Sequence, residues 1–141
     1  MKIIDIKEEF AFSVEKLFNY IEVHENLEAL FFPLKVKTIK TGNINEFGIG
    51  SVRSLSLNGI MPFEETVTVY KKNELIEYKI TKGSPLKNHY GVMKFYSTDK
   101  GSYLHYTIEF DSDIPFVAAI VKVGLENGIH KGLKKLKTII V

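Results

Sequence analysis

Residues 115–141, PFVAAIVKVGLENGIHKGLKKLKTIIV, form the stretch that decides the fold. They predict one long C-terminal helix, because the polar segment 111–113 offers capping oxygens and Pro115 suits a first helical turn. A helix of about 25 residues would be roughly 38 Å long. Its first half is apolar on nearly every side, so we expect the rest of the chain to enclose it.

Three glycines recur at four-residue spacing in this helix, namely Gly124, Gly128 and Gly132. Each one costs about 1 kcal/mol relative to alanine inside a helix. The spacing therefore predicts either a face where another backbone comes close or a bend.

Composition limits the kinds of protein to consider. The chain has 141 residues, 45% of them hydrophobic and 26% charged, which is typical of one globular domain spanning 1–141. It has no cysteine, so disulfides and thiolate chemistry are excluded. The net charge of +2 is too small to indicate nucleic-acid binding.

The location of the protein also follows from charge. Asp5, Glu8 and Glu9 interrupt the first apolar stretch, which excludes an ordinary signal peptide. No uncharged apolar run is long enough to span a membrane. We therefore expect a cytoplasmic protein, without stable membrane insertion, that is a monomer or a homodimer.

Alternation of apolar and polar residues dominates the region before the helix. Residues 2–10 read as a strand, and two short helices follow, one capped by Ser13 and one at about 24–30. Turn signals then separate further strands at 36–41, 51–57, 63–70, 75–82, 87–97 and 103–111. Asn58-Gly59 is one such turn, which we expect to belong to a connection longer than two residues. This order predicts an α+β protein with an antiparallel sheet.

One face of that sheet is predicted to be apolar and to point at the long helix. Hairpin pairing from Leu55 assigns to it Leu57, Val67, Val69, Ile76, Tyr78, Ile80, Gly91, Met93, Phe95, Leu104, Tyr106, Ile108 and Phe110. Three polar residues interrupt this face: Arg53, Glu65 and His89.

Three segments carry a resemblance to a known family: GIGSVRSLSLNG at 48–59, EETVTVYKKNELIEYKITKGSPLKNHYGVMKF at 64–95, and YTIEF at 106–110. With the long terminal helix they resemble the START-like (SRPBCC) superfamily, a Bet v 1-like group, and most closely its polyketide cyclase/dehydrase-type subgroup. The resemblance covers the whole chain. It implies a helix-grip fold, in which a curved seven-stranded antiparallel sheet wraps around the C-terminal helix and an elongated apolar cavity lies between them.

The resemblance also implies roles for single residues. Arg53 matches the family's strand-three arginine, Glu65 its strand-four glutamate, and His89 falls where the abscisic acid receptors have a cavity-facing tyrosine. Residues 58–62 resemble the gate loop of those receptors. Residues 83–86, GSPL, lack the His-Arg pair of the receptor latch, which argues against hormone sensing.

Arg53 and Glu65 are expected to face inward, about one diagonal step apart across a hairpin. Two interpretations remain open: a polar floor that holds a ligand's carboxylate, carbonyl or hydroxyl, or a buried ion pair that closes the narrow end of the cavity. His89 is either an acid or base or a hydrogen-bonded wall. No histidine, cysteine or carboxylate spacing indicates a metal site.

The sequence therefore predicts a carrier of a small hydrophobic or amphipathic molecule, such as a lipid, an isoprenoid or an aromatic polyketide-like compound, with no cofactor. One alternative is a cyclase or dehydrase that uses Arg53 and His89 as catalytic residues. Another is an interaction module whose cavity is incidental. The predicted ligand-binding residues are Arg53, Leu55, Leu57, Met61, Glu65, Val67, Tyr78, His89, Met93, Tyr106, Phe116, Ile120, Val123 and Asn127.

Overall fold

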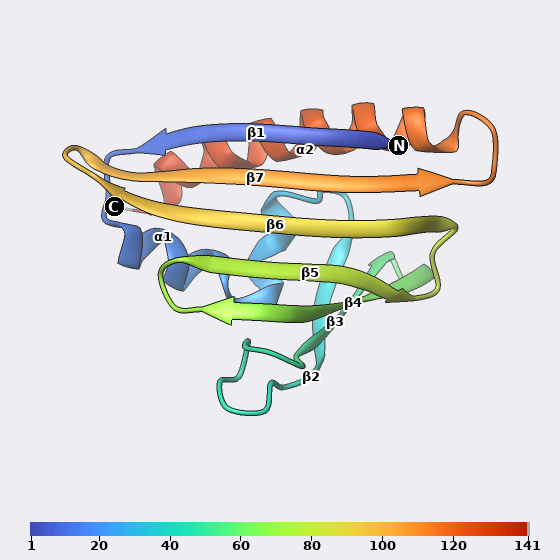
Figure 1. Cartoon of the computed structure of the whole chain (residues 1–141), viewed down its shortest axis with the longest axis horizontal. Coiled ribbons are helices and arrows are strands. Elements are labelled where there is room, and N and C mark those ends of the chain that lie inside the picture. Colours follow the sequence, from blue (N-terminus) through green and yellow to red (C-terminus); the bar gives the residue numbers. More distant parts are fainter. Residues whose placement is uncertain (141) are drawn as a thin grey trace.

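A computed structural model describes residues 1–140 of the chain. Its elements are, in order, β1 (Lys2–Phe10), α1 (Val14–Ile21), the 3₁₀ helix η1 (His24–Ala29), β2 (Lys35–Lys40), β3 (Val52–Leu57), β4 (Ile60–Lys71), β5 (Leu75–Lys82), β6 (Leu86–Thr98), β7 (Gly101–Ser112) and α2 (Val117–Ile139). Figure 1 shows α2 running lengthwise beside β1 and β7.

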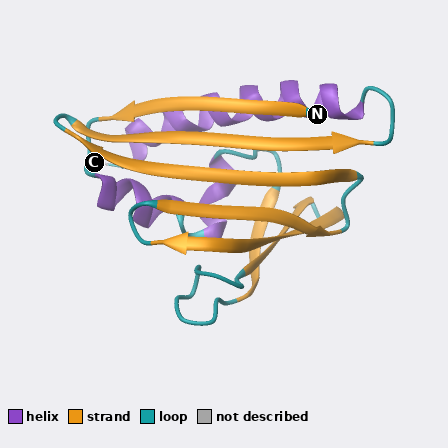
Figure 2. Ribbon diagram, viewed as in Figure 1, coloured by secondary structure: helices purple, strands orange, loops and turns teal. Residues whose placement is uncertain are grey.

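The strands form one seven-stranded antiparallel sheet in the order β1-β7-β6-β5-β4-β3-β2. β1 therefore closes one edge next to β7, while the other strands follow one another as hairpins. The sheet is curved, and the helices lie on one side of it (Figure 2). The α+β helix-grip fold predicted from the sequence is confirmed.

The apolar face of the sheet is the one that alternation predicts. The buried members of that face are Leu55, Val67, Ile76, Tyr78, Met93, Phe95, Leu104, Tyr106, Ile108 and Phe110. Helices α1 and η1 add Leu17, Phe18 and Leu27 to the same core. The α1 helix starts where expected, because the Ser13 side chain accepts a hydrogen bond from the Lys16 amide.

The long helix is present but begins two residues later than its proline suggested. Its N-cap is Phe116, in the left-handed region with φ of 68°, and no side chain caps it. The capping expected from residues 111–113 is therefore wrong. In its C-terminal half, Ile129, Leu133 and Leu136 are buried.

The N-terminal half of α2 is only partly covered, contrary to the expected enclosure. Phe116, Ile120 and Val123 are 82%, 70% and 60% exposed. Val121 and Leu125 instead face the interior. The sheet covers one side of the helix, so a segment that is apolar all round leaves its opposite side in solvent.

The spaced glycines of α2 mark a close approach, as one of the two interpretations predicted. A Cβ atom at Gly132 would lie 2.4 Å from the carbonyl oxygen of Ala29, and one at Gly128 would lie 3.3 Å from that of Leu30. A Cβ atom at Gly124 would point into open space. The helix therefore lies close to the end of η1 at Gly132 and to the following residue, Leu30, at Gly128.

The β3–β4 connection is tighter than expected. Leu57 pairs with Ile60, so Asn58 and Gly59 alone form the turn, with φ of 53° and 79°. These positive φ angles fit a two-residue hairpin turn whose twist matches that of the strands. The expectation of a longer connection is wrong because a register shift between Leu55 and Leu57 absorbs the irregularity within the strands.

Candidate functional site

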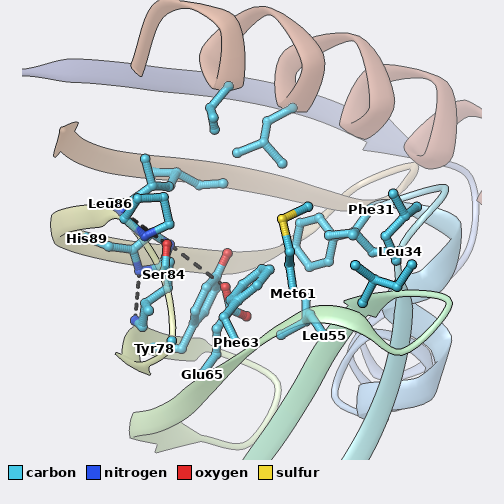
Figure 3. A pocket seen from close by; sticks show the side chains of 18 residues that line it. Phe31, Leu34, Leu55, Met61, Phe63, Glu65, Tyr78, Ser84, Leu86 and His89 are labelled. Carbon is cyan, nitrogen blue, oxygen red and sulfur yellow. Dashed lines mark hydrogen bonds and ion pairs between the residues drawn. The ribbon is translucent and has the colours of Figure 1, made fainter. Parts of the chain in front are cut away.

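A cavity of about 530 Å³ lies between the sheet and α2. Figure 3 shows side chains from both layers pointing into it. Its lining consists of Phe31, Leu34, Leu55, Leu57, Ile60, Met61, Phe63, Glu65, Tyr78, Ile80, Gly83, Ser84, Pro85, Leu86, His89, Ile108, Val121 and Leu125. Most of these side chains are apolar, so the cavity suits a molecule with a large hydrophobic surface.

The start of β4 and the connection from β5 to β6 form part of the cavity wall. Ile60 and Met61, at the β3–β4 hairpin, line it and are also 62% and 74% exposed, so the cavity meets solvent there. The segment 83–86 between β5 and β6 lies against this hairpin, because a Cβ atom at Gly83 would be 2.6 Å from the Pro62 carbonyl oxygen. The segments that resemble gate and latch therefore lie together at the cavity.

Six of the predicted ligand-binding residues line the cavity: Leu55, Leu57, Met61, Glu65, Tyr78 and His89. Arg53, Val67, Met93 and Tyr106 are buried but are not part of the lining. They form the layer behind it.

The α2 residues predicted for the cavity are placed elsewhere. Phe116, Ile120 and Val123 lie on the exposed side of the helix, and Asn127 lines a separate groove beside Tyr20. The error is one of helix rotation: the stripe that faces the cavity contains Val121 and Leu125 instead. An apolar surface all round gave no signal to distinguish the two stripes.

Arg53 is the centre of a buried polar network. Its Nε donates to Glu65 Oε1 at 2.7 Å, and its Nη1 lies 3.1 Å from His24 Nδ1. The guanidinium carbon lies 4.4 Å from the centre of the Tyr78 ring. Burial lowers the pKa of Arg53, but the charge of Glu65 and its hydrogen bond outweigh this and raise it. Arg53 therefore stays protonated, and Glu65 balances its positive charge inside the protein.

His24 was not predicted as part of any site, although it is fully buried in this network. Because Arg53 has only donors, His24 Nδ1 accepts, and Nε2 carries the hydrogen that it donates to Ser51 Oγ at 3.0 Å. Burial, followed by the charge of Arg53, lowers the pKa of His24 to about 3. The residue is therefore neutral at neutral pH and bonded on both nitrogens.

His89 and Glu65 form the polar end of the cavity. The amide of Ile80 donates to His89 Nδ1 at 2.9 Å, so Nε2 carries the hydrogen in neutral His89. That Nε2 lies 3.8 Å from Glu65 Oε2 (Figure 3). Burial lowers the pKa of His89, although the charge of Glu65 opposes this.

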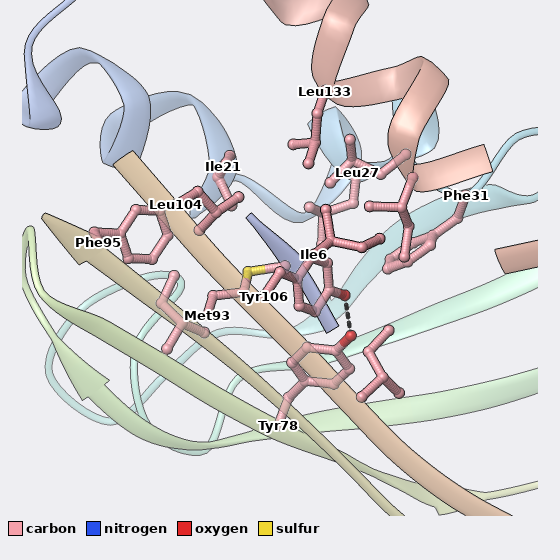
Figure 4. Close-up of a cluster of buried hydrophobic side chains, with 14 of the residues drawn as sticks. Ile6, Ile21, Leu27, Phe31, Tyr78, Met93, Phe95, Leu104, Tyr106 and Leu133 are labelled. Carbon is pink, nitrogen blue, oxygen red and sulfur yellow. Dashed lines mark hydrogen bonds between the residues drawn. The ribbon is translucent and has the colours of Figure 1, made fainter. Parts of the chain in front are cut away.

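Tyr78 separates the cavity from the core behind it. Its hydroxyl is hydrogen-bonded to that of Tyr106 (Figure 4). Its ring packs on the backbone of Gly91, where a Cβ atom would lie 2.3 Å from the ring. Burial raises the pKa of both tyrosines, so both are neutral phenols. Only glycine at position 91 leaves room for this ring.

Several functional residues were missed by sequence reasoning. Ile80 and Ile108 stood on the predicted inner face but were not selected, whereas Phe31 and Leu34 come from the segment after η1 that no periodicity assigned to a face. In the part of the chain that the structure describes, no cluster of three or more metal-ligating side chains is present. Within residues 1–140, no helix is both long and apolar enough to cross a membrane.

A curved antiparallel sheet holding a long C-terminal helix, with a mainly apolar cavity between them, defines a helix-grip protein of the START-like (SRPBCC) superfamily. The chain belongs to the family described as polyketide cyclase/dehydrase and lipid transport, whose model matches residues 1–140.

Solved structures share the fold. The protein XoxI from Bacillus cereus is 18% identical, with a TM-score of 0.72 and coverage of 99% of this chain and 96% of that one. The Aha1 dimer from Colwellia psychrerythraea is 14% identical, with a TM-score of 0.70 and coverage of 99% and 96%. Ara h 8.0201 is 18% identical, with a TM-score of 0.65 and coverage of 94% and 98%. No curated protein is similar enough to count as a match.

Proposed function

We propose that this protein binds or carries one small, mainly hydrophobic molecule in the cavity between the sheet and α2. The observation that supports this most is the cavity itself: about 530 Å³, lined by aliphatic and aromatic side chains, with Glu65 and His89 as a small polar end. Known small-molecule sites have volumes of about 300–1,000 Å³ and the same division between apolar walls and few polar groups. The family description, which includes lipid transport, agrees with this function.

Burial of apolar surface would supply most of the binding free energy, at roughly 25 cal/mol per Å² removed from water. The ligand classes that fit are lipids, isoprenoids and aromatic polyketide-like compounds. We place this function in the cytoplasm and in a monomer or homodimer, without a cofactor.

An enzyme of the cyclase or dehydrase type is the second candidate. It is favoured by the proton donor of His89 and the acceptor of Glu65, which face each other 3.8 Å apart at the cavity's polar end. Arg53, the other predicted catalytic residue, lies behind the lining, so His89 and Glu65 would carry the proton transfer. A cyclase gene is expected beside polyketide synthase genes, whereas a carrier needs no such neighbours.

Binding of an environment-sensitive apolar dye tests the proposed function. We expect saturable, one-to-one binding, and we expect Ile80→Asn to weaken it about tenfold. Ile80 lines the cavity, so an amide there must lose its water under an apolar ligand, at a cost of about 1–3 kcal/mol. A fluorescence titration measures both quantities.

Lys79→Asn is the matched control, because it introduces the same side chain at the neighbouring, exposed position of β5. We expect it to change dye affinity less than twofold. Equal effects of the two changes, or dye binding without saturation, would refute a binding site in this cavity.

A further inference from the structure

The polar end of the cavity holds one hydrogen-bond acceptor and one donor that do not satisfy each other. Glu65 Oε2 and His89 Nε2 lie 3.8 Å apart, beyond hydrogen-bond length, and their side chains are 6% and 5% exposed. Each residue has its other polar atom engaged, Oε1 by Arg53 and Nδ1 by the Ile80 amide. Within the described part of the chain, Glu65 Oε2 and His89 Nε2 therefore each lack a hydrogen-bond partner, and both are held in place at the cavity.

The other two polar side chains of the lining each have a hydrogen-bond partner already, although the bond that Ser84 accepts leaves its hydroxyl hydrogen unused. Ser84 Oγ accepts from the Leu86 amide, and the Tyr78 hydroxyl is bonded to that of Tyr106. Arg53 is outside the lining, with Nε on Glu65 and Nη1 on His24. The remaining nitrogen of Arg53, Nη2, is buried without a hydrogen-bond partner among residues 1–140, but it belongs to a residue outside the lining. A ligand inside the cavity therefore meets the carboxylate of Glu65 before the guanidinium of Arg53.

Resting on the proposed function, we infer that the ligand carries a hydroxyl group that bridges Glu65 and His89. A hydroxyl oxygen about 2.8 Å from each atom closes a triangle with the gap between them. Its hydrogen is donated to Glu65 Oε2, and its lone pair accepts from His89 Nε2. The bond to the charged carboxylate is the stronger of the two.

Other oxygen functions fit this gap less well. An ether or a ketone accepts from His89 but donates nothing to Glu65 Oε2, which then stays buried without a partner. A carboxylate places a second negative charge against Glu65 in a site of low polarity. The geometry therefore ranks an alcohol first, its ether second and the corresponding acid last.

The test uses three probes with the same ten-carbon chain: decanol, methyl decyl ether and decanoate. Each competes with the bound dye at neutral pH. We expect decanol to displace the dye at a concentration about tenfold lower than the ether, and decanoate to be the weakest competitor. The ether carries one methyl group more than decanol, which favours the ether by about 0.8 kcal/mol when buried. A preference for decanol therefore comes from the polar end of the cavity.

Two variants assign the ratio to its residue. Arg53→Met with Glu65→Leu removes the acceptor together with its buried counter-charge, and we expect the preference for decanol over the ether to fall at least threefold, because the alcohol then has no carboxylate to which it can donate. Ser84→Ala is the control, because Ser84 lines the same cavity but its oxygen is used by the Leu86 amide. We expect it to leave the preference unchanged.

The outcomes separate this inference from the function on which it rests. If none of the probes displaces the dye, the proposed function fails and the inference with it. If alcohol, ether and acid compete equally, the cavity binds apolar chains, but Glu65 and His89 do not recognise a hydroxyl group. If decanoate competes best, the inference is overturned, because the polar end of the cavity then prefers an anion.

Discussion

We expect Arg53→Met to lower the free energy of unfolding by about 3–5 kcal/mol, the cost of leaving a buried charge without its partner. The Glu65 side chain is 6% exposed and receives the Arg53 Nε hydrogen at 2.7 Å. The change also leaves His24 Nδ1 without its donor. Denaturation by urea at neutral pH measures the loss.

The double variant Arg53→Met with Glu65→Leu identifies the cause. Removing both charges leaves no unpaired ion, so we expect most of the lost stability to return. Arg53→Lys should fall between wild type and Arg53→Met, because one ammonium group lacks the planar fork that serves both Glu65 and His24. If Arg53→Met differs from wild type by less than about half a kcal/mol, the pair is not a buried structural element.

The second large effect is a loss of folding stability in acid, which we attribute to His24. The folded-state pKa of His24 is about 3, lowered by burial and then by Arg53, while an unfolded chain has a histidine pKa of about 6.5. Between these values the unfolded state binds the proton and the folded state does not. The stability that neutral His24 contributes is present in full above about pH 6.5 and is lost as the pH falls toward 3. The loss in the free energy of unfolding reaches roughly 3 kcal/mol at about pH 4.

His24→Gln isolates that contribution. A glutamine oxygen can accept from Arg53 while its amide donates to Ser51, and it does not titrate. We expect the variant to be less stable at neutral pH but to lose about 3 kcal/mol less than wild type between about pH 7 and pH 4. Parallel stability curves for the two proteins would contradict the placement of His24 in the buried network.

The sheet could be predicted from the sequence because two local signals agree along most strands. Alternation assigns Tyr78 and Tyr106 to the interior, and turn residues separate the strands. Arg53 and Glu65 were placed on the inner face for the same reason. The register shift near Leu57 was not foreseen, because a bulge arises from pairing between strands and leaves little trace in either one.

The candidate site was predicted less well because it depends on contacts between distant segments. His24 joins Arg53 across 29 positions of sequence, and no local pattern signals that contact. Alternation placed Arg53 inward but did not show that Tyr78 stands between it and the cavity. Ile120 was assigned to the cavity because the first half of α2 is apolar all round, which leaves the rotation of the helix undefined.

Native mass spectrometry of the protein purified from its natural source tests the central claim most directly. We predict a one-to-one complex that exceeds the mass of the chain by a few hundred daltons and releases a hydrophobic molecule bearing a hydroxyl group on activation. The protein stripped of that molecule should recover the same mass when the molecule is returned. A spectrum of the bare chain alone, from protein that also fails to take up decanol or the dye, would contradict the account.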